Sequence, residues 1–432
     1  MQRPPSVDEL ARKLAHHGLP HPLLVEVARS AIANRCVDDA DDLVRSRTRR
    51  LLTPVINATG VLLHTNMGRA PLAHQGDAQY TNLELDLASG ARGSRQAAIG
   101  ELLATATGAE AAMVVNNCAG AVMLALAAVA GGHSVAVSRG ELVEIGGAFR
   151  VPDVMALSGA ELVEVGTTNR TRLGDYRKAV DQGAHAVLKV HQSNYRIVGF
   201  TEETSVRALS TVDVPVIADI GSGLLDSSCP WLDGPPPRWL EGEPAARQTL
   251  RDGADLVTFS GDKLFGGPQA GIIAGKAELV AACGRHPLAR ALRPGSLVLD
   301  ALQTTTMAYL DRRGGDIEFW RMAATPVHEL ERRANDLAVR FGSTSVIDTH
   351  AVPGGGTLPT VSIPSRGVRI NADQTSQLRE FDPPVIARVD KGATIIDVLT
   401  INPDDDWVVG KAMESLGASI VGAQTNAKEG LS

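Results

Sequence analysis

The middle of the chain, from Ile56 to about Gly275, alternates short apolar runs with segments of helix length. Runs rich in valine, alanine, leucine and isoleucine are typical of buried strands, and the longer segments between them are typical of helices that cover the sheet. The pattern therefore predicts an α/β domain with a mainly parallel sheet and helices on both faces. The strand-like runs are AAMVVNN, HSVAVS, AELVEV, HAVLKVH, VPVIADIG, DLVTFS and AGIIAGK.

The two ends of the chain follow other patterns. Residues 1–55 place leucine, valine and alanine at helical spacing, with prolines between two predicted helices. Near the C-terminus, MAATPVHELERRANDLAVRF predicts an amphipathic helix, GTLPTVSIP a strand, and PVIARVDKGATIIDVLTI a hairpin that turns at Asp390–Gly392. We therefore expect a helical N-terminal domain (1–55), a large α/β domain (56–300) and a small α+β domain (301–432).

Composition and charge narrow the class of protein. Apolar residues make up 44% of the chain and charged residues 21%, which is close to the average for folded proteins and excludes a disordered chain. The formal net charge is 42 − 49 = −7, which disfavours nonspecific coating of nucleic acid but not a local basic surface. Aromatic residues are only 3%, which disfavours binding of single strands by stacked rings.

The cysteines and the apolar runs bear on metal binding and location. No two of the four cysteines have the spacing of metal ligands, so neither a zinc site nor a disulfide scaffold is supported. The start of the chain carries no apolar signal region, and the longest uncharged apolar run, Cys118 to Ala130, is too short to span a bilayer. We therefore expect a soluble cytoplasmic protein without a metal ion.

Candidate chemistry lies where the predicted strands end, because ligands of open α/β sheets bind at the carboxyl ends of the strands. Asn117-Cys118-Ala119 follows the first strand and opens a helix, where free backbone N–H groups suit a phosphate; an ordinary asparagine-capped helix is the alternative. Asp219 ends another strand, and a buried carboxylate there is costly without a cation, although a loop-capping role stays open. His191 ends a third strand, as a catalytic or a structural histidine.

The most informative segment is SGDKLFGGPQ, which begins at Ser260 and carries Lys263. A lysine on a tight loop between two buried strands is desolvated, and such an amine can form a Schiff base with an aldehyde. Together with a phosphate-binding turn and the carboxylate of Asp219, this lysine indicates pyridoxal 5'-phosphate. The chain order of asparagine loop, aspartate and lysine resembles that of the aspartate-aminotransferase superfamily, fold type I.

Several longer motifs together resemble the bacterial selenocysteine synthases, the L-seryl-tRNA(Sec) selenium transferases. The resemblance covers essentially the whole chain from Ile56 on, and it implies a fold type I pyridoxal-phosphate transferase with a seven-stranded, mainly parallel sheet. The motifs are INATGVLLHTNMGRAPL (56–72), NLELDLASGARGSR (82–95), SRGELVEIGGAFRVPD (138–153), HQSNYRIVGFT (191–201), DIGSGL (219–224), TFSGDKLFGGPQAG (258–271) and HPLARALRPG (286–295).

The resemblance implies conversion of seryl-tRNA(Sec) to selenocysteinyl-tRNA(Sec) through an aminoacrylyl-tRNA, with selenophosphate as the selenium donor. Lys263, Asp219 and His191 are the expected catalytic residues, and Lys263 would hold the cofactor and take the α-proton. Arginines bind phosphate-like anions well, although an exposed helix face with surface ion pairs is the alternative for Arg290 and Arg293. The expected cofactor contacts are Asn117, Cys118, Ala119, Asp219, Ser260 and Lys263, and the expected selenophosphate contacts are Arg95, Arg290 and Arg293.

The resemblance also implies partners. The N-terminal domain would recognise the fold of the tRNA through cations, and Arg45, Arg47, Arg49 and Arg50 are candidates unless they pack as a linker helix. The family assembles as a ring of five dimers, so we expect a homo-oligomer in which Arg95 and the Asn57–Arg69 stretch act on the partner's cofactor. The Glu141–Gly147 stretch lies where related enzymes place the residue that stacks on the cofactor ring.

Two other functions stay open. A pyridoxal-phosphate lyase acting on a small amino acid or an amino sugar phosphate would share Lys263 and Asp219, but it needs neither a tRNA-binding domain nor the pair Arg290 and Arg293. A non-catalytic tRNA-binding scaffold would need neither Lys263 nor Asp219. The presence of all of these features favours the transferase.

Overall fold

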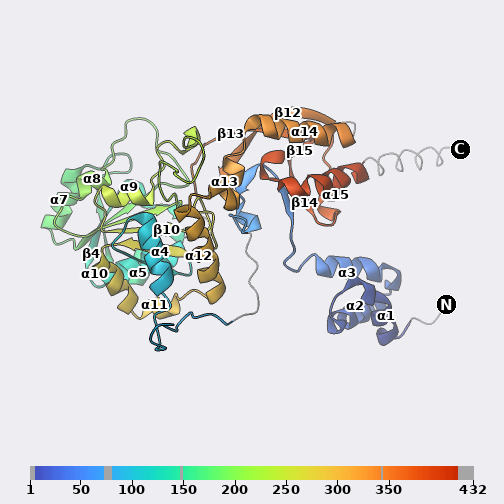
Figure 1. The fold of residues 1–432 in the computed structure, drawn as a ribbon, viewed down its shortest axis with the longest axis horizontal. Coiled ribbons are helices and arrows are strands. Elements are labelled where there is room, and N and C mark those ends of the chain that lie inside the picture. The colour runs from blue at the N-terminus through green and yellow to red at the C-terminus, as the bar shows by residue number, and fades with distance from the viewer. Residues whose placement is uncertain (1–4, 73–79, 146–148, 342–343, 417–432) are drawn as a thin grey trace. The chain divides into compact units, whose positions relative to one another are not determined.

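The computed structural model describes residues 5–72, 80–145, 149–341 and 344–416 (Figure 1). The chain divides into two compact units, one formed by 1–56, 376–386 and 411–432 and the other by 57–375 and 387–410. Within the described ranges, no helix is both long and apolar enough to cross a membrane.

The N-terminal part of the first unit is a small helical bundle. It contains α1 (Val7–Lys13), α2 (His21–Ala33) and α3 (Ala40–Thr48), as the helical spacing predicts. Ser6 caps α1, and α2 begins beside Pro20 and carries a proline in its first turn, where no backbone donor is needed. The three helices share a core of leucine, valine and alanine side chains.

The second unit contains a seven-stranded sheet, which confirms the expected sheet. The strand order is β3-β11-β10-β9-β8-β4-β7, and β11 runs antiparallel to both of its neighbours while the other pairings are parallel. The strands are β3 (Ala111–Val115), β4 (Ser134–Ser138), β7 (Glu161–Val165), β8 (Ala186–Val190), β9 (Val216–Gly221), β10 (Leu256–Ser260) and β11 (Gly271–Gly275).

Helices precede, connect and follow these strands, and several of them cover the sheet. They are α4 (Ala97–Thr107), α5 (Cys118–Ala130), α6 (Val151–Ser158), α7 (Leu173–Asp181), α8 (Val206–Leu209), α9 (Ala246–Arg251), α10 (Ala277–Arg285), α11 (Leu288–Ala291), α12 (Ser296–Leu310) and α13 (Glu318–Ala323). A two-stranded ribbon, β5 (Glu144–Ile145) and β6 (Phe149–Arg150), precedes α6.

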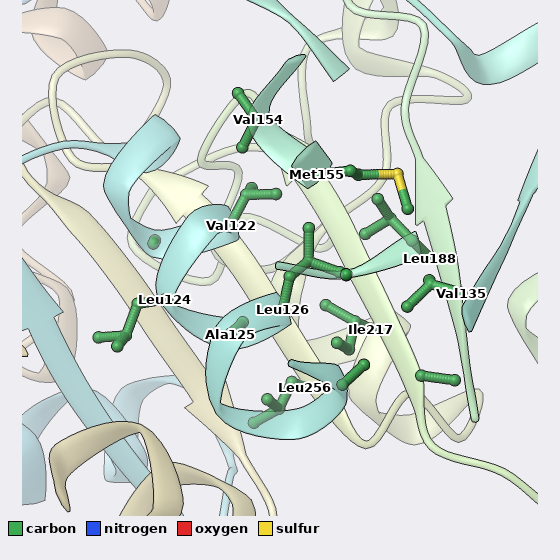
Figure 2. Packing of buried hydrophobic residues seen from close by; sticks show 14 of the residues in the cluster. Val122, Leu124, Ala125, Leu126, Val135, Val154, Met155, Leu188, Ile217 and Leu256 are labelled. Carbon is green, nitrogen blue, oxygen red and sulfur yellow. The ribbon is translucent and has the colours of Figure 1, made fainter. Parts of the chain in front are cut away.

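The core confirms that helices pack on both faces. On one face, Val122 and Leu126 of α5 lie in a cluster with Val135 of β4, as Figure 2 shows. The next residue of β4, Ala136, belongs to a second cluster with Tyr176 of α7. Successive side chains of a strand point to opposite faces, so this split between two clusters places apolar layers above and below the sheet.

A second sheet has the order β1-β14-β15-β13-β12-β2, and α14 (Val327–Phe341) packs against β12 and β13. Its helix α14 buries Leu330, Ala334 and Leu337, which recur at helical spacing. The remaining elements are β1 (Ile56–Ala58), β2 (Val61–Leu63), β12 (Thr344–Gly354), β13 (Ile363–Ile370), α15 (Thr375–Glu380), β14 (Val385–Asp390) and β15 (Ala393–Asp397).

The sequence predictions for this sheet are partly right. The hairpin turn at Asp390–Gly392 is confirmed, because Asp390 pairs with Ala393 and both residues between them have positive φ. The strand predicted for GTLPTVSIP is wrong in its first part, since β13 starts only at Ile363. The preceding residues form a loop in which Leu358 and Thr360 have positive φ, which no strand allows.

Candidate active site

The loop between β10 and β11 holds Lys263. Two backbone hydrogen bonds close the loop. The N–H of Gly261 donates to the carbonyl oxygen of Ala270 at 2.9 Å. The N–H of Gly266, whose φ is +70°, donates to the carbonyl oxygen of Lys263 at 2.8 Å. The lysine is 5% exposed, and its Nζ donates to the carbonyl oxygen of Gly356 at 3.2 Å. The structure therefore buries this amine against a backbone oxygen, where it is available to react with an aldehyde.

Asp219 lies near the end of β9, directly opposite Thr258 of β10. Its Oδ1 accepts a hydrogen bond from Thr258 Oγ1 at 3.0 Å and lies 3.5 Å from Cys118 Sγ. Burial raises the pKa of Asp219, although the Thr258 hydroxyl and the Lys263 amine oppose this effect. A buried carboxylate of this kind is stabilised by a cationic ligand such as a protonated pyridine nitrogen.

The turn from β3 into α5 brings the predicted phosphate-binding residues to the same edge. Asn117 Oδ1 caps the helix by accepting from the N–H of Gly120 at 2.8 Å. No described residue accepts from the N–H groups of Cys118 and Ala119, which therefore stay available for an anion. A Cβ on Gly271 would lie 2.1 Å from the carbonyl oxygen of Asn117, so the start of β11 and this turn are in close contact.

These three features fit pyridoxal phosphate. The amine of Lys263 suits its aldehyde, the carboxylate of Asp219 its ring nitrogen, and the free N–H groups at the start of α5 its phosphate. Ser260, the last residue of β10, is buried beside them and lowers the pKa of Cys118 by hydrogen bonding, against the larger effect of burial, which raises it.

His191 follows β8, and its N–H donates to the carbonyl oxygen of Asp219 at 2.9 Å. Its Nδ1 lies 3.9 Å from Oε1 of Glu243, a residue that no sequence motif singles out. Burial lowers the pKa of His191 to about 4. His191, Asp219 and Glu243 line a cavity of about 280 Å³ together with Leu358 and Pro359 of the loop that reaches Lys263.

The structure joins two of the three predicted selenophosphate contacts through Glu84. Arg95 Nε and Arg293 Nη1 lie 3.0 and 3.5 Å from the same Oε1 of Glu84, and the exposed Arg92 contacts Oε2 at 2.7 Å. Arg290, at the end of α11, is exposed and has no ion pair with a described residue. The signal for Glu84 lies inside NLELDLASGARGSR, where it is one of two acidic side chains.

Arg69 is a further residue that the structure brings to the site. Its Nη1 lies 2.7 Å from Oδ2 of Asp262, the residue before Lys263, and the next residue, Ala70, donates its N–H to the Asp262 carbonyl oxygen at 3.1 Å. The segment that carries Arg69 thus packs beside the lysine of its own chain. Its motif, TNMGRAPL, could have indicated Arg69, but not its partner.

Two further groups of predicted residues, the Glu141–Gly147 stretch and the N-terminal arginines, mostly contact other parts of their own chain. In the Glu141–Gly147 stretch, Glu141 is buried and binds Lys189 Nζ at 2.6 Å, while residues 146 and 147 lie outside the described residues. Among the N-terminal arginines, Arg45 pairs with Asp42, Arg47 with Glu26, and Arg49 donates to the Glu380 carbonyl oxygen, whereas Arg50 is exposed.

Comparison with known proteins gives a consistent answer. The model of the L-seryl-tRNA selenium transferase family matches residues 55–402. The L-seryl-tRNA(Sec) selenium transferase of Geobacter metallireducens is 44% identical over 90% of this chain and 88% of its own length. That of Moorella thermoacetica is 43% identical over 87% and 84%, and that of Geobacter sulfurreducens 41% identical over 95% and 96%.

Among solved structures, a D-glucosaminate-6-phosphate ammonia-lyase superposes with a TM-score of 0.57 at 20% identity, over 86% of this chain and 98% of its own. This likeness confirms the expected fold class. The family match over most of the chain and the identity above 40% to full-length relatives confirm the family that the sequence motifs suggested. The chain belongs to the L-seryl-tRNA(Sec) selenium transferases.

Proposed function

We propose that this protein converts L-seryl-tRNA(Sec) to L-selenocysteinyl-tRNA(Sec), with pyridoxal 5'-phosphate as cofactor and selenophosphate as selenium donor. The observation that carries the proposal is the buried amine of Lys263, one strand away from the buried carboxylate of Asp219, in a chain that matches the family from residue 55 to 402.

The residues at the strand ends hold the cofactor. Lys263 Nζ would hold its aldehyde, Asp219 would pair with its ring nitrogen, and the free N–H groups of Cys118 and Ala119 would bind its phosphate beside Asn117. When bound, pyridoxal phosphate supplies the electron sink that makes the α-proton of the serine acidic and lets its β-hydroxyl leave. The amine of Lys263 would take that proton on Nζ.

The arginines around Glu84 form the anion site for selenophosphate. Arg95 and Arg293 present guanidinium groups at one place, and Arg290 lies three residues before Arg293 on the same segment. Guanidinium groups bind a phosphate-like group through paired hydrogen bonds and orient its selenium atom. The backbone links this site to the cofactor turn, because the N–H of Asn116 donates to the carbonyl oxygen of Leu292 at 2.9 Å.

The remaining expectations are part of the same proposal. Residues 1–55 form a tRNA-binding domain, 56–300 the catalytic domain and 301–432 a small C-terminal domain. The exposed Arg45, Arg49 and Arg50 offer positive charge to the RNA backbone. The protein acts in the cytoplasm as a homo-oligomer built from dimers, with the decamer as the expected form.

The test uses purified holoprotein, seryl-tRNA(Sec) and selenophosphate. We expect selenocysteinyl-tRNA(Sec) as product, and we expect borohydride to fix a pyridoxyl label on Lys263 that is missing in Lys263→Ala. Turnover of a free amino acid or an amino sugar phosphate without selenium transfer would favour a lyase instead. A colourless protein that takes up no cofactor would favour a non-catalytic tRNA-binding protein.

A further inference from the structure

Three buried polar atoms close to Asp219 make no hydrogen bond of ordinary geometry, although Ser222 lies near enough to Glu243 to lower the pKa of its carboxyl group. They are Nδ1 of His191, Oε1 of Glu243 and Oγ of Ser222. The side chain of Glu243 is 2% exposed, and its Oε1 is 3.9 Å from His191 Nδ1. Unsatisfied buried polar atoms are rare and costly, so a group of them beside the predicted catalytic lysine calls for a functional explanation.

The two nitrogens of His191 have different surroundings. Nδ1 is sealed from solvent and faces Glu243, whereas Nε2 is not among the sealed atoms and has no partner among the described residues. The His191 side chain is 25% exposed and lines the cavity that also contains Asp219. The nitrogen that a ligand can reach is therefore Nε2, and whether Nε2 carries a proton depends on what Nδ1 binds.

The protonation states that burial favours are complementary. Burial raises the pKa of Glu243 to about 7, while Ser222, Lys263 and Arg196 oppose this effect. Burial also lowers the pKa of His191 to about 4; Glu203 and the backbone at Ile220 oppose that effect, and Lys189 and Lys263 reinforce it. A carboxylic acid beside a neutral imidazole has an O–H to donate to a nitrogen lone pair.

We propose that Glu243 is a positioning residue, which as a neutral acid donates a hydrogen bond to Nδ1 of His191 and so keeps the proton of the imidazole on Nε2. Rotation of the carboxyl group about its last side-chain bond would close the 3.9 Å separation. His191 then presents a fixed N–H donor to the ligand that lies between Asp219 and Lys263. Ionisation of Glu243 removes the donor, and the imidazole proton moves to Nδ1. This inference rests on the proposed function, because it takes His191 as part of that active site.

The test compares Glu243→Gln with Glu243→Ala. The amide of Gln has an N–H to donate at every pH, so Glu243→Gln should keep selenium transfer near the wild-type rate at pH 6. The rate of the wild type should fall as the pH rises through about 7, whereas the rate of Glu243→Gln should not. Glu243→Ala should lose about tenfold at pH 6, the effect of one buried hydrogen bond. Glu241→Gln is the matched control, because Glu241 lines the same cavity but is exposed.

A second measurement tests the pair without catalysis. Infrared difference spectra of the holoprotein should show a protonated carboxyl band that disappears as the pH rises through about 7, and that is missing in Glu243→Gln but present in Glu241→Gln. Equal losses in Glu243→Gln and Glu243→Ala, identical pH profiles in wild type and Glu243→Gln, or a band that survives in Glu243→Gln would each overturn the inference. If the wild type transferred no selenium, the proposed function would fail, while the infrared titration would still decide the pairing.

Discussion

Arg95 and Arg293 reach the same carboxylate oxygen, Oε1 of Glu84, from segments that are far apart in the sequence. Arg95 is fixed further, since its Nη1 donates to the carbonyl oxygen of Pro294 at 3.2 Å. With Arg92 on the second oxygen, one negative charge faces three positive charges. The excess of positive charge, in a chain of net charge −7, suits a second anion at this place.

The first prediction concerns that anion. Arg293→Ala should leave the absorbance of the bound cofactor unchanged but reduce selenium transfer by about 10- to 100-fold, the effect of losing a charge-assisted hydrogen bond. Arg92→Ala is the control, because Arg92 binds the same Glu84 but is 79% exposed, and it should stay within about twofold of the wild type. Steady-state rates at varied selenophosphate concentration measure both. Equal rates in the two variants would show that Arg293 does not bind the anion.

The second prediction concerns the contact between the lysine loop and the cofactor turn. In Gly271→Ala the new Cβ would lie 2.1 Å from the carbonyl oxygen of Asn117 and 2.9 Å from the nitrogen of Cys118, so the turn must move. We expect affinity for pyridoxal phosphate to fall by about 5- to 150-fold, since overpacking of this kind costs about 1–3 kcal/mol. Gly284→Ala is the control, because Gly284 lies in α10 with open space around it. Cofactor titration followed by absorbance distinguishes the two, and an unchanged affinity in Gly271→Ala would mean that the turn does not bind the phosphate.

Much of the catalytic unit could be predicted because its signals are local. Each strand of the seven-stranded sheet is a short apolar run with turn residues around it, and burial on both faces gives such runs in any parallel sheet. Lys263 and Asp219 stand out for a related reason, since a charged side chain within or close after such a run must be near a partner or a ligand. Their proximity then follows from parallel topology, which gathers strand ends at one edge.

The rest depends on approaches between distant segments. Glu84 and Glu243 look like ordinary acidic residues in the sequence, and only the positions of Arg95 and His191 give them a role. The sequence predicts a strand for the loop that contacts Lys263 through Gly356. A segment rich in apolar residues and threonine is compatible with a strand and with a loop, so composition alone does not distinguish them. The preceding strand β12 was not predicted, because exposed, half-buried and buried positions are mixed along it.

The third prediction concerns the stability of the C-terminal sheet. Arg333 of α14 is 3% exposed, and it binds Asp406 at 2.6 Å and the carbonyl oxygens of Val398 and Ile401 at 3.1 and 3.0 Å. Arg333→Ala leaves all three acceptors without this donor, so the free energy of unfolding should fall by about 3–5 kcal/mol. The neighbouring Arg332→Ala removes an exposed pair with Asp336 and should cost less than about 1 kcal/mol. Urea denaturation of both variants measures the difference, and similar losses would show that the buried network contributes no more than a surface pair.

The fourth prediction is a pair of opposite pH effects on the stability of the cofactor-free protein. Burial raises the pKa of Glu243 from its ordinary 4.5 to about 7, so Glu243 favours the folded state fully below pH 4.5, and this contribution is lost as the pH rises to 7. Burial lowers the pKa of His191 from 6.5 to about 4, so its contribution is present above pH 6.5 and is lost as the pH falls to 4. The two slopes largely cancel in the wild type.

Single substitutions should therefore reveal each slope. The difference in unfolding free energy between Glu243→Gln and the wild type should rise by about 3 kcal/mol as the pH rises from 4.5 to 7. The difference between His191→Gln and the wild type should rise by a similar amount as the pH falls from 6.5 to 4. Groups elsewhere in the protein cancel in these differences, and Glu241→Gln, at an exposed position on the same cavity, is the matched control. Urea midpoints measured across this range test both slopes. A flat difference for Glu243→Gln would mean that Glu243 is ionised when the protein is folded, and His191 would then have no neutral acid beside Nδ1.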